Sequence, residues 1–120
     1  MRQLVTINKY LSRQVRRNLC SVLANTQNPQ QVNSLLSDLL SAEEFDRIAK
    51  RLAVAQFLNK SRSYADIKAN LQVSPTEIAK VAKNVDGQGY QFAINDIKAE
   101  LWADNWSRRL ARLLKPLFSR

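Results

Sequence analysis

Two short amphipathic segments with three residues between them constrain the fold of this chain more than any other feature. They lie in the stretch SYADIKANLQVSPTEIAKVAKN, residues 63–84. In the first segment, Ile67 and Leu71 are four residues apart and therefore share one face of a helix. In the second, Ile78 and Val81 share a face in the same way. The pattern predicts two helices joined by a tight turn and packed through these apolar pairs, a helix-turn-helix.

The residues at the helix ends support this prediction. The first helix is expected over Tyr64–Leu71, and the second begins after Ser74, whose side chain can accept from a free backbone N–H. Pro75 suits the first helical position, and Glu77 can reach back to the cap. Gln72 stands where such turns usually carry glycine, and a positive φ would cost it about 1 kcal/mol. Either Gln72 adopts that conformation or the turn differs.

The second helix of such a motif enters the major groove of DNA, so its outward residues are candidates for base contacts. Lysine donates to guanine, glutamate accepts from cytosine N4, and an alanine methyl contacts the thymine methyl. We predict base contacts from Ser74, Pro75, Thr76, Glu77, Ala79 and Lys80. We predict phosphate contacts, which position the protein without specifying sequence, from Arg62, Lys68 and Lys83.

Composition indicates an all-α protein. The 120 residues suffice for one domain with a modest core, and they include only two glycines and three prolines. No stretch approaches about 18 uncharged apolar residues, and the first residues lack the apolar core of a signal peptide. We expect a single domain over residues 1–120 with about six helices, no transmembrane segment and a cytoplasmic location.

Side chains that carry catalytic chemistry are scarce. The chain has no histidine, and its one cysteine, Cys20, lies in an apolar context that favours a small core residue. The carboxylates Glu43, Glu44 and Asp46 fall at the start of an expected helix, where the helix dipole favours negative charge. We expect no catalytic residue, no metal site, no cofactor and no enzymatic activity.

The formal net charge of +9 is concentrated at the two ends. Residues 1–20 hold five bases and no acid, and residues 108–120 hold the same. Basic ends suit a polyanion, either nucleic acid or an anionic membrane surface, although a solvated face that aids solubility is the alternative. We therefore expect a basic N-terminal helix within residues 1–24 and a basic amphipathic helix over residues 97–120.

The remaining periodicity predicts four further helices. They are expected over Thr6–Ala24, Gln30–Leu40, a stretch from a Ser41 capping box to Asn59, and Tyr90–Phe118 with a break near Asn105. Both glycines place a loop over residues 84–89. The inward positions expected of the helix that ends at Asn59 are Phe45, Ile48, Leu52, Ala55 and Leu58. The stripe expected on the last helix is Leu101 or Trp102, Trp106, Leu110, Leu113 or Leu114, and Leu117.

Residues 40–94 resemble the Trp repressor superfamily. The phrases RLAVAQFL, DIKANL, VSPTEIAKV and GYQFAI carry the likeness, and all but DIKANL look closest to the Trp-repressor-related YerC/YecD-type branch. The resemblance implies a core over residues 41–94 and an intertwined homodimer of transcriptional repressors or regulators. It also implies two copies of the second helix about one DNA turn apart, a spacing taken from helix-turn-helix proteins such as Trp repressor itself.

The resemblance also points to a possible ligand position. In the family, two arginines clasp the corepressor, and Arg51 and Lys80 occupy the matching positions here. Lysine lacks the planar fork that binds a carboxylate through two bonds, which argues against a tryptophan-type corepressor.

Three functions follow from these observations. The first is a sequence-specific regulator of transcription, a repressor, that binds double-stranded DNA as a homodimer. The second is a helical adaptor that binds a membrane surface or a partner through the basic C-terminal helix. The third is a nucleic-acid binder without sequence preference that uses its two basic ends.

Overall fold

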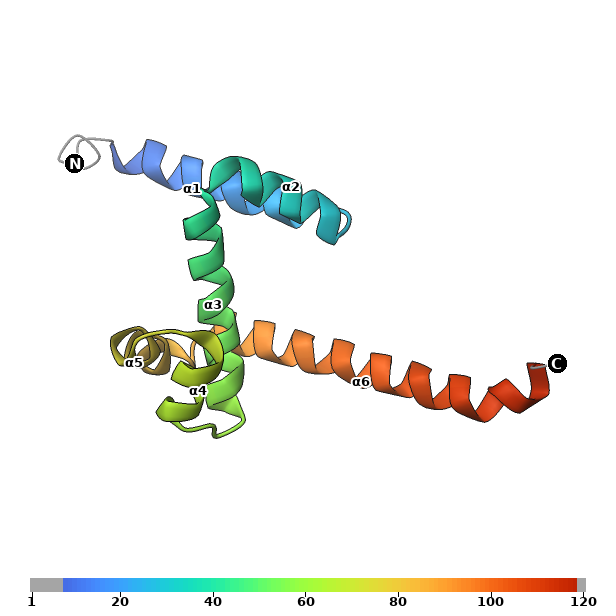
Figure 1. Ribbon diagram of the computed structural model, residues 1–120. Coiled ribbons are helices and arrows are strands. Elements are labelled where there is room, and N and C mark those ends of the chain that lie inside the picture. Colours follow the sequence, from blue (N-terminus) through green and yellow to red (C-terminus); the bar gives the residue numbers. More distant parts are fainter. Residues whose placement is uncertain (1–7, 119–120) are drawn as a thin grey trace. The chain divides into compact units, whose positions relative to one another are not determined.

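Helices account for nearly all of the structure, a computed structural model that describes residues 8–118. Within α6, the side chains of residues 102–107, 109–111 and 113–118 are outside that description. The described residues form six helices and no strand, which confirms the all-α prediction (Figure 1). The helices are α1 (Lys9–Ala24), α2 (Pro29–Leu39), α3 (Ala42–Asn59), α4 (Tyr64–Leu71), α5 (Pro75–Asn84) and α6 (Gln88–Phe118). They fall into two compact units, residues 1–45 and 46–120.

Side-chain caps define where most helices begin. Asn8 Oδ1 accepts from Leu11 N at 2.8 Å, and Asn28 Oδ1 accepts from Gln31 N at 2.9 Å. These bonds satisfy donors that the first turn of a helix leaves free. The predicted capping box before α3 is confirmed, because Ser41 N donates to Glu44 Oε1 at 2.8 Å and Glu44 N donates to Ser41 Oγ at 3.1 Å. The predicted start of the first helix at Thr6 lies outside the described residues.

The first unit buries none of its own apolar stripe. Neither α1 nor α2 contains a buried residue. The residues Leu11, Val15, Leu19 and Val22 recur at steps of three and four and form an apolar stripe on α1, yet they are between 45% and 53% exposed. A 16-residue helix is marginal in water unless its apolar face is covered. The two helices therefore need apolar cover beyond what they give each other.

Cys20 was predicted to be a core residue, and that prediction is wrong in this structure. Its side chain is exposed. The stripe on α1 continues from Leu19 to Val22, and Cys20 lies outside it because the next residue along a helix is rotated by about 100°. The side chain of Cys20 therefore lies on a different side of the helix from the stripe.

The second unit has a small core built from four helices. Its buried residues are Val54 and Ala55 on α3, Ile67 on α4, Ile78 and Val81 on α5, and Ile94 on α6. Leu71 packs against this cluster, so the predicted pairing of the two short helices is confirmed. The prediction missed Val54, which is buried, and wrongly placed Ile48 inside, where the structure leaves it 46% exposed. The reason is that α3 turns different sides to its neighbours along its length.

Gln72 adopts the left-handed conformation between α4 and α5. Its φ and ψ are 53° and 48°, and its N–H donates to Lys68 O at 2.9 Å. Of the two possibilities left open by the sequence, the structure therefore shows the strained one. The helix bounds Tyr64–Leu71 agree with the prediction, and α5 ends at Asn84, the first residue of the predicted loop.

The predicted loop over residues 84–89 is too long. The turn covers only residues 85–87, and Gly89 is helical in α6. Gly87 O accepts from Gln91 N at 3.0 Å in the first turn of α6. Gly89 lies in the same turn, where a glycine costs less stability than it does in the middle of a helix. The break expected near Asn105 is absent from the described backbone of α6.

The predicted stripe on α6 lies beyond Leu101 and outside the described side chains, and Leu101 itself is 48% exposed. Among the described residues, no helix combines the length and the apolar character needed to cross a bilayer.

Candidate nucleic-acid interface

Helix α5 has a buried side and an open side. Ile78 and Val81 are 0% and 4% exposed and hold the helix on the core of the second unit. Thr76, Ala79 and Lys80 are exposed. The open side is polar and basic, and it includes a methyl group at Ala79, a combination suited to base edges in a major groove.

The start of α5 is fixed by its N-cap. Ser74 has an extended backbone, and its Oγ accepts from Glu77 N at 3.2 Å. This bond uses one lone pair and leaves the hydroxyl proton of Ser74 free to donate. Pro75 occupies the first turn and is exposed, while Glu77 is half-buried, the least exposed of the six residues predicted to contact bases.

The three residues predicted to contact phosphates differ in their surroundings. Lys68 and Lys83 are exposed on α4 and α5. Arg62 instead holds a defined position just before α4, because its Nη1 lies 2.9 Å from Asp66 Oδ2 and its guanidinium carbon lies 5.8 Å from the centre of the Phe57 ring. A guanidinium has five donors, so the ion pair leaves others for a phosphate.

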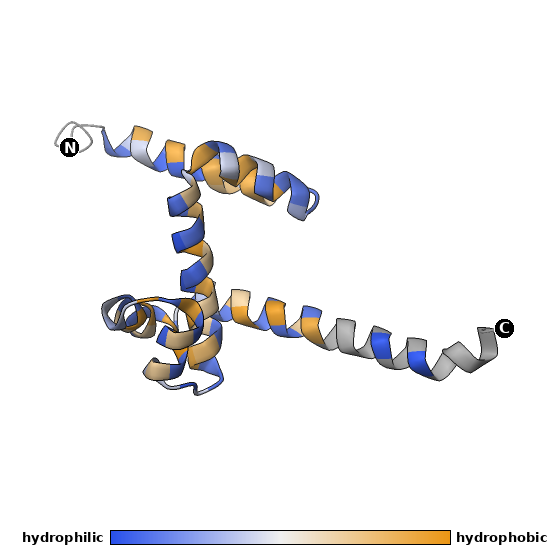
Figure 2. Ribbon diagram, in the orientation of Figure 1, coloured by the Kyte–Doolittle hydropathy of each residue, from blue (hydrophilic) through white to orange (hydrophobic). Residues whose placement is uncertain are grey.

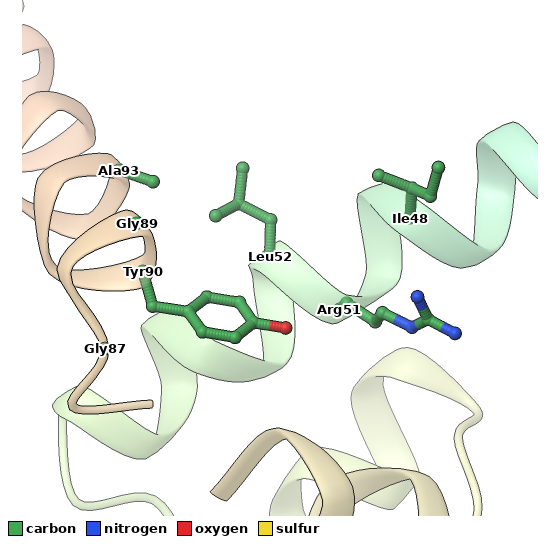
Figure 3. A pocket seen from close by; sticks show the side chains of 7 residues that line it. All are labelled: Ile48, Arg51, Leu52, Gly87, Gly89, Tyr90 and Ala93. Carbon is green, nitrogen blue, oxygen red and sulfur yellow. The ribbon is translucent and has the colours of Figure 1, made fainter. Parts of the chain in front are cut away.

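Arg51 borders a pocket of about 480 Å³ between α3 and the start of α6 (Figure 3). The lining is mostly apolar: Ile48, Arg51, Leu52, Gly87, Gly89, Tyr90 and Ala93. The Tyr90 ring lies across the pocket, and the Arg51 guanidinium extends away from it. Lys80 is not one of the lining residues, so the structure does not bring the two predicted ligand contacts together in this pocket.

Sequence reasoning missed this pocket because its two sides come from helices more than 30 residues apart. The two glycines that line it, Gly87 and Gly89, were interpreted only as loop residues. A Cβ added at Gly89 would meet no atom within 4 Å, so the residue borders open space.

A comparison with protein families indicates a DNA-binding protein, in agreement with the polar and basic open side of α5. The family model described as Trp repressor protein matches residues 14–95, well over half of the chain. The chain belongs to the Trp repressor family. This family consists of DNA-binding transcription regulators, and the match agrees with an all-α chain whose α5 presents a polar face above a core. Neither a curated protein nor a solved structure matches the chain.

The Trp repressor match extends further toward the N-terminus than the resemblance over residues 40–94. It includes all of α2 and most of α1, which sequence reasoning had placed outside the strongest likeness. It ends at Asn95, near the start of α6, so the basic C-terminal part is not covered. The match concerns the family as a whole, and the YerC/YecD-type branch stays a prediction.

Proposed function

We propose that the protein is a homodimeric, sequence-specific transcriptional repressor of the Trp repressor family, acting on DNA in the cytoplasm and without enzymatic activity. The observation that carries this proposal is the two-sided character of α5. Ile78 and Val81 anchor the helix, while Thr76, Ala79 and Lys80 are left open to a partner. A helix held this way from a capped N-terminus suits the reading helix of a helix-turn-helix.

The exposed stripe on α1 supports the dimer. Four aliphatic side chains near half exposure, in a pair of helices (α1 and α2) that contains no buried residue, leave more apolar surface open than two short helices can sustain. A second copy covers such a stripe without any other protein. Two-fold symmetry then gives two copies of α5, which suits a near-palindromic site.

Fluorescence anisotropy at about 0.15 M salt tests the proposal. The protein is titrated into the DNA upstream of its own gene and into a scrambled duplex of equal length, and a random-sequence selection supplies the site if both bind equally. We expect a preference of about 10³-fold or more for the selected site. Equal affinity for every duplex after selection would favour the non-specific binder, and no binding to any duplex would reject DNA as the partner.

Lys80→Ala is expected to weaken binding to the selected site by about 1–3 kcal/mol, with little change on scrambled DNA. The reason is that Lys80 is exposed on the open side of α5 and can donate to a guanine. The same titrations measure both affinities.

Lys83→Ala is the matched control, because Lys83 is an exposed lysine on the same helix that we assign to a phosphate. Its effect is expected to be equal on all sequences. If Lys80→Ala also weakens every duplex equally, then Lys80 contacts a phosphate and not a base.

We further propose that binding does not depend on a tryptophan-type corepressor, since Lys80 replaces the second arginine and does not line the pocket beside Arg51. Saturating L-tryptophan is expected to leave the affinity for the selected site unchanged in anisotropy titrations. An effector coupled to DNA binding typically changes affinity about 5- to 150-fold. An increase in that range would overturn this part of the proposal and would make the pocket beside Arg51 the first candidate for the tryptophan site.

A further inference from the structure

Helix α1 carries a second exposed face, and it is basic. Lys9, Arg13, Arg16 and Arg17 recur at steps of three and four residues and are all exposed. The apolar residues Leu11 and Val15 each lie two positions after a basic one, about 200° around the helix. The basic face is therefore opposite the apolar stripe, and Figure 2 shows hydrophilic and hydrophobic residues alternating along α1.

These charges work against the helix that carries them. Lys9 is the first residue of the helix, where the helix dipole already places positive charge. Arg13 is four residues from both Lys9 and Arg17, a spacing at which like charges repel. No acid precedes Asp38 in the sequence, so α1 and the residues before it supply no compensating carboxylate. The stability of α1 does not explain this arrangement.

An anionic partner would compensate for this repulsion, because its negative charge attracts the same basic side chains. We propose that the basic face of α1 is a second DNA contact, one that binds phosphates of duplex DNA. This inference rests on the proposed function, since it takes DNA as the partner. Contacts of this kind add affinity and salt dependence without sequence preference.

Duplex DNA fits this face better than a membrane surface. A helix that lies in a membrane interface inserts its apolar side into lipid, usually with Trp, Phe or Leu. The apolar stripe of α1 has leucine and valine but neither Trp nor Phe, and the proposed dimer occupies it. The basic face stays open in that arrangement, and phosphates can reach it without displacing the partner subunit.

The first test compares Arg13→Gln/Arg17→Gln with Arg47→Gln/Lys98→Gln, which removes the same charge from exposed residues outside α1 and α5. The α1 variant is expected to bind at least about tenfold more weakly, equally on the selected site and on scrambled DNA. The slope of the logarithm of its DNA affinity against the logarithm of salt concentration should become shallower by about 0.9 for each phosphate that it no longer neutralises. Its thermal stability is expected to be no lower than that of the parent, because like-charge repulsion is relieved. The control is expected to keep both affinity and slope.

Cys20 supplies an independent probe, since it is the one cysteine and is exposed on the basic face, three residues after Arg17 and four after Arg16. A neutral maleimide is expected to modify it readily in the free protein and much more slowly with saturating duplex DNA. A thiol that does not react in the free protein would show that the face is covered, and would overturn the inference.

The outcomes separate this inference from the proposed function. Preference for the selected site, with affinity unchanged in the α1 variant and Cys20 reactivity unchanged by DNA, would overturn the α1 contact alone. Equal binding to all duplexes, still weakened in the α1 variant, would retain the contact and reject sequence recognition by α5. Vesicles of phosphatidylserine and phosphatidylcholine that bind the parent but not the α1 variant, without any effect on DNA binding, would replace DNA by a membrane and overturn the inference.

Discussion

Leu19→Glu is expected to convert the proposed homodimer into monomers. Leu19 lies in the middle of the apolar stripe on α1 and is 45% exposed in the single chain. A carboxylate there would have to leave water without a partner, which costs several kcal/mol. Symmetry repeats the change in the second copy. The dimer should be destabilised by about 4 kcal/mol or more, roughly 10³-fold in its dissociation constant.

Sedimentation equilibrium at micromolar concentration measures this change, and the selected DNA site provides a second readout because a monomer binds only one half-site. For the sedimentation measurement the control is Cys20→Glu, which places the same side chain one residue further along the helix, about 100° away and outside the stripe. Both positions are exposed in the single chain, so a solitary subunit would tolerate both substitutions. If Leu19→Glu keeps the mass of the parent, or if both variants dissociate, a second copy does not cover the stripe.

Ile78→Ala is expected to destabilise the second unit by about 2–5 kcal/mol. Ile78 is 0% exposed and packs with Ile67 and Ile94 in a core that has six buried residues in the described part of the chain. Total stabilities are about 5–15 kcal/mol, so this change is a large share of what holds α4 and α5 in place. DNA binding should fall with it, because the open side of α5 is no longer presented on a fixed surface.

Urea unfolding followed by circular dichroism measures the change in stability, at one fixed protein concentration because the stability of a dimer depends on concentration. Two variants bracket the result. Ile78→Val removes one methylene and should cost about 0.5–1.5 kcal/mol. Thr76→Ala changes an exposed residue of the same helix and should stay within about 0.5 kcal/mol. If Ile78→Ala costs no more than Thr76→Ala, α5 does not depend on this core.

Local chemistry explains which parts of the fold were predictable. The bounds of α4 and the start of α5 follow from Ser63, Ser74 and Pro75, whose effects reach only the next turn of the chain. The strained turn at Gln72 was one of two local alternatives, and the structure shows which one is adopted. The pairing of Ile67 with Ile78 was also accessible, because a short turn brings adjacent amphipathic helices together.

Features that depend on distant partners were predicted less well. Periodicity marked Ile48 as inward and passed over Val54, since it identifies an apolar face of α3 but not which helix covers each turn of it. Gly89 suggested a loop, although a helix tolerates glycine in its first turn. The pocket beside Arg51 needed α3 and α6 to meet, and nothing in either segment encodes that meeting.

The sequence by itself determined the bounds of α4, the start of α5, the capping box before α3 and the basic charge of α1, because these depend on residues within a few positions of one another. Likeness of sequence also determined the family. The tertiary structure decided which sides of α5 are buried and open, that Cys20 is exposed, and where a pocket forms. Those outcomes depend on burial of apolar surface between segments far apart in the chain, and burial is a property of the packed molecule.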